Sequence, residues 1–201
     1  DTPGFIANRF GMWAMFHAVH TAERLRLSIE QVDAICGPFL GRPRSAAFRL
    51  NDLVGLDVMA FIAGIVHERS PEDPYRDTLL LPKSLQFLMD KGWTGQKAGQ
   101  GYYHKFGKEL LAFDLDTHAY RNSLEVNIPS LTENAKLPLG TRVRNALQAR
   151  DEAGEFLREH LIPVLKYAEY LKAEISHSVQ DFDRVMQWGF GWEVGPFAMI
   201  D

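Results

Sequence analysis

Residues Phe5–Val19 read FIANRFGMWAMFHAV, and this stretch decides the fold. Nearly every position in it is apolar or aromatic, with Asn8, Arg9 and His17 as the exceptions. A helix that is apolar on all sides is buried inside a domain, because no face of it suits contact with water. The stretch therefore predicts a buried helix and a mainly α fold.

Helical patterns continue after this stretch. Ser28 and Gln31 form a capping box for a short helix that runs through Cys36. Glycine–proline breaks follow, and a third helix is expected to begin near Ser45. Further helices are expected at residues 58–66, 83–91, 141–150 and 152–175, the last with a kink at Pro163.

One segment between the helices has a different pattern. Residues 108–121 carry β-compatible side chains on either side of the turn-like sequence Asp114-Leu115-Asp116, which predicts a small β-hairpin. The hairpin is expected to be a connector. Residues 122–139 contain Pro129 and Pro138 and are expected to form a linker.

The chain contains an approximate internal repeat. Residues 28–33 read SIEQVD, and residues 178–183 read SVQDFD. Gly41 and Gly191 each follow the last aspartate by eight positions, and Phe48 and Phe197 each precede an aspartate (Asp52, Asp201) by four. The alignment that matches Gly41 with Gly191 and the alignment that matches Phe48 with Phe197 differ by one residue. We therefore expect a duplicated domain, with a first helical unit at residues 1–105, a hairpin and linker at 106–139, and a second, truncated helical unit at 140–201.

Charge and composition exclude several classes of partner. The 201 residues include 22 basic and 26 acidic side chains mixed along the chain. The sequence therefore has no concentration of positive charge that would predict binding to nucleic acid or an anionic membrane. The longest nearly apolar run, Val54–Val66, is too short to span a bilayer. The single cysteine and the absence of a secretory pattern at the first residues favour a cytoplasmic location.

Three motifs, in this order, carry a family resemblance: Thr2–Arg9 (TPGFIANR), Asp52–Asp57 (DLVGLD) and Gly92–Tyr103 (GWTGQKAGQGYY). Together they resemble the C-terminal domain of 3-hydroxyacyl-CoA dehydrogenases, a helical fold like the C-terminal domain of 6-phosphogluconate dehydrogenase. Residues 189–197 (GFGWEVGPF) resemble the start of a second such domain, as in multifunctional fatty-acid oxidation proteins. Residues 42–48 (RPRSAAF) replace the Gly-Pro-Phe version usual in single-unit members, which also favours the two-unit type.

The resemblance implies oxidation of an (S)-3-hydroxyacyl-CoA in β-oxidation, with hydride transfer to NAD. It places the catalytic histidine, its glutamate and the NAD site in a nucleotide-binding domain outside this sequence, so none of the seven histidines here is assigned that role. The expected partners are the 3-hydroxyacyl-CoA substrate, that missing domain, and a fused or associated enoyl-CoA hydratase. We expect this chain to bind no NAD itself and to be inactive alone.

Asn8 is the one catalytic-site residue that the resemblance carries over. In the family the corresponding asparagine lies beside the active-site cleft. An amide in a helix that is otherwise apolar needs hydrogen-bond partners, and a substrate oxygen or a catalytic imidazole across a domain interface would supply them. The alternative is that Asn8 caps or bridges backbone groups near the start of the helix.

Other signals have simpler structural explanations. Gly99-Gln100-Gly101 begins a dinucleotide-like pattern, but His104 replaces the third glycine, so we expect no cofactor site and interpret the glycines as turn formers. His67-Glu68 lacks a second histidine, and we expect no metal site. Cys36 is expected to be a buried apolar residue, and Asp52 and Asp57 are expected to have capping and dipole roles at a helix start.

The role of three basic residues stays open. Arg42 and Arg44, together with Lys97 if the fold brings it near, could contact the CoA phosphates or could be solvated on a surface turn.

Two readings of the whole chain remain: part of a dehydrogenase, or a non-catalytic helical interaction and dimerisation module derived from one. A third reading changes the substrate to a 3-hydroxy acid without CoA. Since the resemblance makes this domain the dimerisation surface of single-unit relatives, we expect a pseudo-twofold pairing of the two units. Residues 5–19 are then expected to pack near the helix that contains Phe156, Leu161, Leu165 and Ala168.

Overall fold

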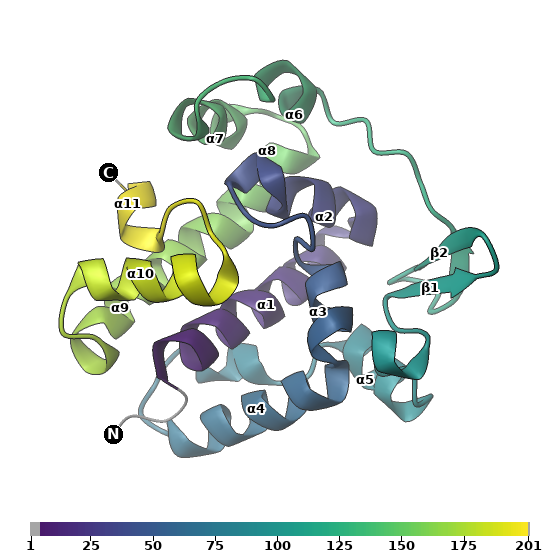
Figure 1. Ribbon diagram of the computed structural model, residues 1–201, viewed down its shortest axis with the longest axis horizontal. Coiled ribbons are helices and arrows are strands. Elements are labelled where there is room, and N and C mark those ends of the chain that lie inside the picture. The colour runs from purple at the N-terminus through teal and green to yellow at the C-terminus, as the bar shows by residue number, and fades with distance from the viewer. Residues whose placement is uncertain (1–4, 201) are drawn as a thin grey trace.

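The computed structural model describes residues 5–200, and the fold is mainly α, as expected (Figure 1). Thr2, Pro3 and Gly4 of the first motif, and Asp201 of the repeat, lie outside the described residues. The α-helices are α1 (Phe5–Leu25), α2 (Ile29–Cys36), α3 (Phe48–Val54), α4 (Leu56–Arg69), α5 (Lys83–Asp90), α6 (Pro129–Asn134), α7 (Leu139–Gln148), α8 (Glu152–Phe156), α9 (Ile162–Ile175), α10 (Val179–Phe190) and α11 (Pro196–Ile200). Short helical turns are η1 (Pro38–Leu40), η2 (Arg76–Leu79), η3 (Gln96–Ala98) and η4 (Leu157–Leu161).

The first helix, α1, forms the centre of the core. Phe10 and Phe16 are fully buried and Trp13 is 2% exposed. Helices α4, α9 and α10 all pack against α1. The predicted buried helix is therefore confirmed, and its aromatic side chains are core residues.

Helix α3 begins later than the sequence indicates. Residues before Phe48 form a turn, and a side chain from α2 caps the start of α3: the Asp33 carboxylate accepts hydrogen bonds from the backbone N–H groups of Ala47 and Phe48. The first N–H groups of a helix lack partners within the helix, so this carboxylate determines where α3 starts. A cap supplied from another helix leaves no local signal near Ser45. The capping box of α2, by contrast, is formed as predicted.

The long helix expected at residues 152–175 is present as α8, η4 and α9. The backbone accommodates Pro163 through a π turn, η4, directly before the proline. Proline lacks an N–H group, so the α-helical bond to the preceding turn is absent there in any case. A π turn therefore precedes α9, and the kink at Pro163 stays a prediction.

The hairpin is one strand larger than predicted. Strands β1 (Tyr103–Phe106), β2 (Glu109–Phe113) and β3 (Tyr120–Asn122) form an antiparallel sheet in the order β1-β2-β3. The predicted pairing around the Asp114 turn is that of β2 with β3, in which Phe113 lies opposite Tyr120. In the linker, Pro129 starts helix α6, where its fixed φ and missing N–H are suited to the first turn.

The repeat is present in the hydrogen bonds. Asp33 accepts from the N–H groups of Ala47 and Phe48, and Asp183 accepts from those of Phe197 and Ala198. Gly41 and Gly191 both adopt left-handed backbone conformations. These equivalent positions are all 150 residues apart, so the hydrogen bonds align the two units without a shift. In this alignment Phe197 corresponds to Ala47, whereas the sequence pattern matches it to Phe48, the next residue.

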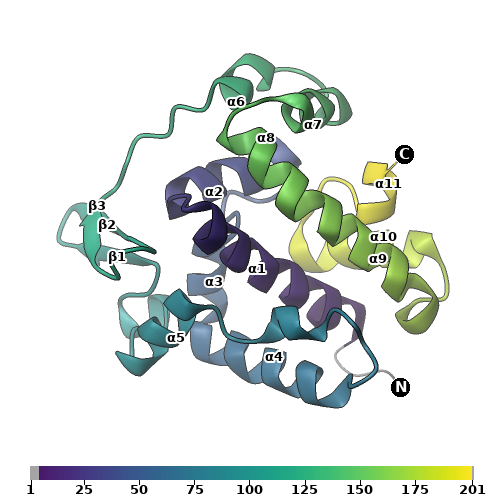
Figure 2. The same ribbon diagram turned by 180° about the vertical axis from the view of Figure 1, so that it is seen from behind.

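The two units pack as a pseudo-twofold pair. Helix α1 lies beside η4 and α9, as expected (Figure 2). Each contact has a counterpart with the two units exchanged: Phe10 stacks with Tyr167, and His17 with His160. Arg9 pairs with Glu174, and Arg24 with Glu159. Because residues 10 and 160, 17 and 167, 9 and 159, and 24 and 174 are equivalent positions, these contacts are reciprocal.

The junction between the units obeys the same symmetry. The N–H group of Glu193 donates to the carbonyl of Gly41, while Pro43, the equivalent of Glu193, lies against Gly191. The guanidinium of Arg42 lies over the ring of its own equivalent, Trp192. The pseudo-twofold axis therefore passes close to Arg42 and Trp192. The boundaries at 105/106 and 139/140 stay a prediction.

No single helix among residues 5–200 is long and apolar enough to cross a bilayer. Helices α3 and α4 together have the length and composition, but they meet at an angle of 89°.

Candidate functional site

Asn8 lies on the exposed side of the first turns of α1. The side chain is exposed, and the assignment of Asn8 to the catalytic site stays a prediction. Within residues 5–200 no hydrogen bond of the Asn8 side chain is formed, and none is required, because the amide is open to solvent. The position is suited to contact with a molecule or domain outside the described residues.

The neighbouring residue, Arg9, fixes the orientation of this part of α1. Its buried guanidinium donates to the carboxylates of Asp73 and Glu174, and the Tyr167 hydroxyl donates to the same Asp73 oxygen at 2.7 Å. Burial acts to lower the pKa of Arg9, but the hydrogen bonds to Glu174 and Asp73 outweigh it and raise that pKa. Arg9 therefore stays charged, and its network sets which side of α1 faces outward at Asn8.

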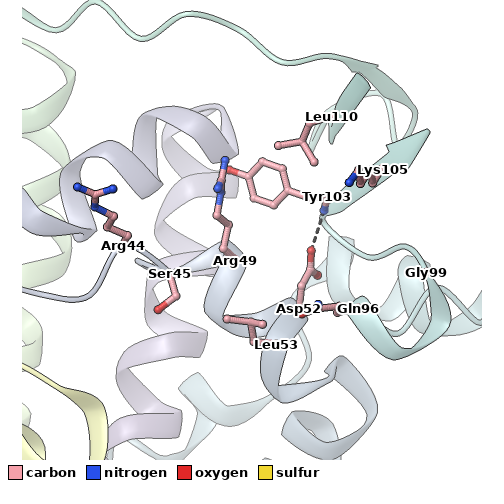
Figure 3. Close-up of a pocket in the computed structure, with 10 residues that line it drawn as sticks. All are labelled: Arg44, Ser45, Arg49, Asp52, Leu53, Gln96, Gly99, Tyr103, Lys105 and Leu110. Atoms are coloured by element: carbon pink, nitrogen blue, oxygen red, sulfur yellow. Dashed lines mark hydrogen bonds between the residues drawn. The ribbon is translucent and has the colours of Figure 1, made fainter. Parts of the chain in front are cut away.

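A groove of about 730 Å³ lies between α3 and the three-stranded sheet (Figure 3). It is lined by Arg44, Ser45, Arg49, Asp52, Leu53, Gln96, Gly99, Tyr103, Lys105 and Leu110. The two internal motifs of the sequence, residues 52–57 and 92–103, form much of this lining. The sequence singles out Arg44 and Asp52 but misses Arg49 and Lys105, because nothing in their local pattern shows that α3 and β1 are adjacent.

Asp52 joins the two motifs at the floor of the groove. It lies within α3, and its carboxylate accepts hydrogen bonds from the backbone N–H groups of Tyr102 and Tyr103, each at 2.8 Å. The prediction of a helix cap at Asp52 is therefore wrong, whereas Asp57 lies in the first turn of α4 as expected. Burial raises the pKa of Asp52 to about 7.

The glycines of the second motif allow this contact. A side chain at Gly101 would place a Cβ atom 2.2 Å from the Asp52 carboxylate. The loop is held against α3 by this close approach. The interpretation of these glycines as structural is supported by this geometry.

Asp33 holds the other wall of the groove. Its carboxylate accepts a hydrogen bond from the Tyr103 hydroxyl at 2.8 Å, in addition to those from the start of α3. Burial raises the pKa of Asp33 to about 6. The Arg49 guanidinium carbon lies 5.0 Å from the centre of the Tyr103 ring. The carboxylates are thus occupied with structural bonds, and Arg44, Arg49 and Lys105 supply the charge available to a ligand, which suits an anion.

The three basic residues considered for CoA phosphates are separated in the structure. Arg44 lines the groove. Arg42 is packed beneath Trp192 at the junction of the two units, and Lys97, in η3, does not line the groove. Cys36 is fully buried, as expected. Among the residues that the structure describes, no group of three or more His, Cys, Asp or Glu side chains is placed to hold a metal ion.

Comparisons with known proteins agree with the motifs. A family model described as 3-hydroxyacyl-CoA dehydrogenase, C-terminal domain, matches residues 4–105. A Bacillus subtilis protein named "Probable 3-hydroxyacyl-CoA dehydrogenase" is 38% identical over 203 residues, covering 100% of this chain and 26% of that protein. A Rickettsia prowazekii protein named "Putative fatty acid oxidation complex trifunctional enzyme" is 28% identical, covering 100% of this chain and 27% of that protein. The chain thus spans about a quarter of the length of these relatives.

A solved structure shares the fold. The crystal structure of 3-hydroxybutyryl-CoA dehydrogenase from Escherichia coli K12 superposes with a TM-score of 0.57 at 16% identity, covering 98% of this chain and 52% of that chain. The similarity extends over both units of the chain and not over the first unit alone.

Proposed function

Because the chain belongs to the family of 3-hydroxyacyl-CoA dehydrogenase C-terminal domains, we propose that it forms the substrate side of an NAD-dependent (S)-3-hydroxyacyl-CoA dehydrogenase. The reaction is oxidation of the 3-hydroxyl group to a ketone, with hydride transfer to NAD. The observation that supports this most is the family match over residues 4–105, which includes Asn8 and both motifs that meet at Asp52. The name of the Rickettsia prowazekii relative supports a role in fatty-acid oxidation.

The residues present do not fit an NAD site. Among residues 5–200 the sheet consists of three short antiparallel strands, and the glycine-rich loop at residues 92–101 packs on Asp52. A dinucleotide site requires a parallel strand, a glycine turn and the N-terminus of a helix pointing at the pyrophosphate. In our proposal NAD, the catalytic histidine and its glutamate therefore belong to another domain, and the 201-residue chain is inactive alone.

Asn8 is the proposed contact between this domain and the reacting groups. Its amide can donate one hydrogen bond and accept another, so it suits a substrate oxygen or a neutral catalytic imidazole. The exposure of Asn8 supports this role, since the amide has no competing partner within residues 5–200. The charged Arg9 side chain, through its hydrogen bond to Asp73, holds α1 in the orientation that exposes Asn8.

The groove of Figure 3 is the proposed site for the CoA phosphates. Arg44, Arg49 and Lys105 line it, and none of these side chains is fully buried. Replacing Arg44 and Arg49 by alanine in the intact enzyme is expected to raise the KM for a 3-hydroxyacyl-CoA and to leave the KM for a short thioester lacking the nucleotide unchanged. An equal effect on both substrates would remove the groove from the proposal.

The partners and location follow from the same proposal. The relative named as a trifunctional enzyme supports a fused or associated enoyl-CoA hydratase. A cytoplasmic location agrees with the single buried cysteine, which needs no oxidising compartment.

One assay separates the proposed readings. NADH formation is measured by absorbance with the 201-residue chain and with the longer protein that contains it, using a 3-hydroxyacyl-CoA and the matching free 3-hydroxy acid. The proposal expects turnover of the CoA thioester by the longer protein only. Turnover by the 201-residue chain would contradict the assignment of NAD and the catalytic histidine to another domain. Turnover of the free acid would change the proposed substrate class. An inactive longer protein would favour a non-catalytic dimerisation module.

A further inference from the structure

Arg42 is partly buried, and two of its three guanidinium nitrogens are buried without a partner. Its guanidinium carbon lies 4.1 Å from the centre of the Trp192 ring, so one face of the group is covered. Its Nε and Nη2 atoms are buried, and no residue between 5 and 200 accepts a hydrogen bond from them. Among residues 5–200 no carboxylate forms an ion pair with Arg42, and burial lowers the pKa of the group. Buried N–H groups of a cation that have no acceptor are unfavourable.

A small cavity lies next to this group. Its volume is about 30 Å³, which exceeds the roughly 10–15 Å³ needed for one water-sized species but excludes an organic ligand. Most of the wall is apolar, and it includes the small residues Gly11, Ala14 and Ala18 of α1 and the turn residues Ala46 and Ala47.

The other polar groups in the wall provide no negative charge. Burial raises the pKa of the Cys36 thiol to about 12, so the thiol stays protonated. Burial also lowers the pKa of His160 well below its ordinary value, so the imidazole stays neutral. The cavity therefore contains one cation and no internal anion.

We propose that this cavity binds a single small inorganic anion of the halide class, held by Arg42 Nε and Nη2. A halide can accept both N–H groups and also neutralises the guanidinium, whereas a water molecule does only the first. The volume suits a monoatomic ion. Because Arg42 and Trp192 are equivalent positions of the two units, the anion would lie at the junction between them and stabilise their pairing.

Chloride is the probe for the first experiment. The unfolding midpoint of the 201-residue chain is measured at constant ionic strength while chloride replaces gluconate. Binding to the folded state alone is expected to raise the midpoint along a single-site saturation curve, with the unfolding constant falling about 100-fold at a chloride concentration 100 times Kd. Arg42→Met is expected to abolish the dependence, and Arg150→Met, at an exposed arginine, is expected to keep it.

A second measurement covers the case in which Arg42→Met does not fold. Crystals of the unmodified chain are grown with bromide, and the anomalous signal is expected to show one peak within hydrogen-bond distance of Arg42. A flat chloride response, or a response that persists in a folded Arg42→Met variant, overturns the proposal. So does a cavity that contains only water, and a bromide peak without a chloride-dependent midpoint would mean an adventitious ion only.

Discussion

At the scale of single residues, the contact between Gly101 and Asp52 holds the floor of the groove. A methyl group at residue 101 would lie 2.2 Å from the carboxylate, so the loop or α3 would have to move. Gly101→Ala is therefore expected to destabilise the fold by roughly 3 kcal/mol or more, as measured by urea unfolding.

Gly99→Ala is the matched control. Gly99 has a positive φ of 81° but has nothing within 4 Å of an added Cβ atom, so only the left-handed backbone is penalised, at about 1 kcal/mol. Equal losses for the two variants would mean that the contact with Asp52 is not what requires glycine at position 101.

At this scale the amino-acid sequence predicts part of the structure. It identified the glycines as structural and Cys36 as buried, and both follow from local composition. It missed the roles of Asp52 and Asp33, because each carboxylate accepts N–H groups from another element, 50 and 14 residues further along the chain. It does not show that Asn8 is exposed, since a mostly apolar helix does not reveal which of its few polar positions faces outward.

At the scale of elements, two equivalent ion pairs lie in different environments. Arg9 is buried with Asp73 and Glu174, whereas Arg24 and Glu159 are about half exposed. Arg9→Met is expected to cost about 3–5 kcal/mol because it leaves the Asp73 carboxylate buried without its cation. Arg24→Met is expected to cost at most about 1 kcal/mol.

Urea unfolding of the two variants tests this difference directly. Since both arginines are on α1 and occupy exchanged positions of one symmetric interface, helix propensity and geometry are closely matched. Similar losses in the two variants would show that burial does not decide the strength of these pairs.

The paired histidines predict how the α1–α9 contact responds to acid. Burial, with smaller contributions from His20 and Arg24, lowers the pKa of His17 to about 4, and burial also lowers that of His160. The folded state therefore binds protons less readily than the unfolded chain, whose histidines titrate near 6.5. Stability from this pair is fully present above about pH 6.5 and is lost as the pH falls from there towards 4.

His160→Phe copies Phe10, the equivalent residue of the first unit, and is expected to reduce this loss between pH 6.5 and 5. The free energy of unfolding is compared across that range with His177→Phe, at an exposed histidine. The same acid sensitivity in the His160 variant and the unmodified chain would contradict the assignment of that sensitivity to the buried pair.

Most elements could be predicted because their signals are local. The capping box at Ser28, the turn at Asp114 and the helix at 152–175 are all present where the sequence indicates. The start of α3 and strand β1 depend on partners distant in sequence, namely Asp33 for α3 and β2 for β1. Local patterns do not contain that information.

At the scale of the whole molecule, the duplication explains why so apolar a helix is stable in one chain. Helix α1 buries its faces against η4 and α9 of the second unit, and the reciprocal contacts repeat with the units exchanged. The sequence repeat predicted this pairing because equivalent caps and turns imply equivalent surfaces. The two units are not chemically equivalent, however, since residue 158, the counterpart of Asn8, is an arginine that donates to the carbonyls of Leu147 and Ala149.

That asymmetry leaves the first unit as the proposed site of chemistry, and Asn8 is its most direct test. In the longer protein, Asn8→Ala is compared with Gln180→Ala, which removes another exposed amide, by measuring NADH formation and thermal unfolding. The account predicts that kcat falls about 10- to 100-fold for Asn8→Ala alone, with the unfolding midpoint unchanged. An unchanged kcat together with a lowered midpoint would return Asn8 to a structural role and contradict the assignment of this domain to the substrate side.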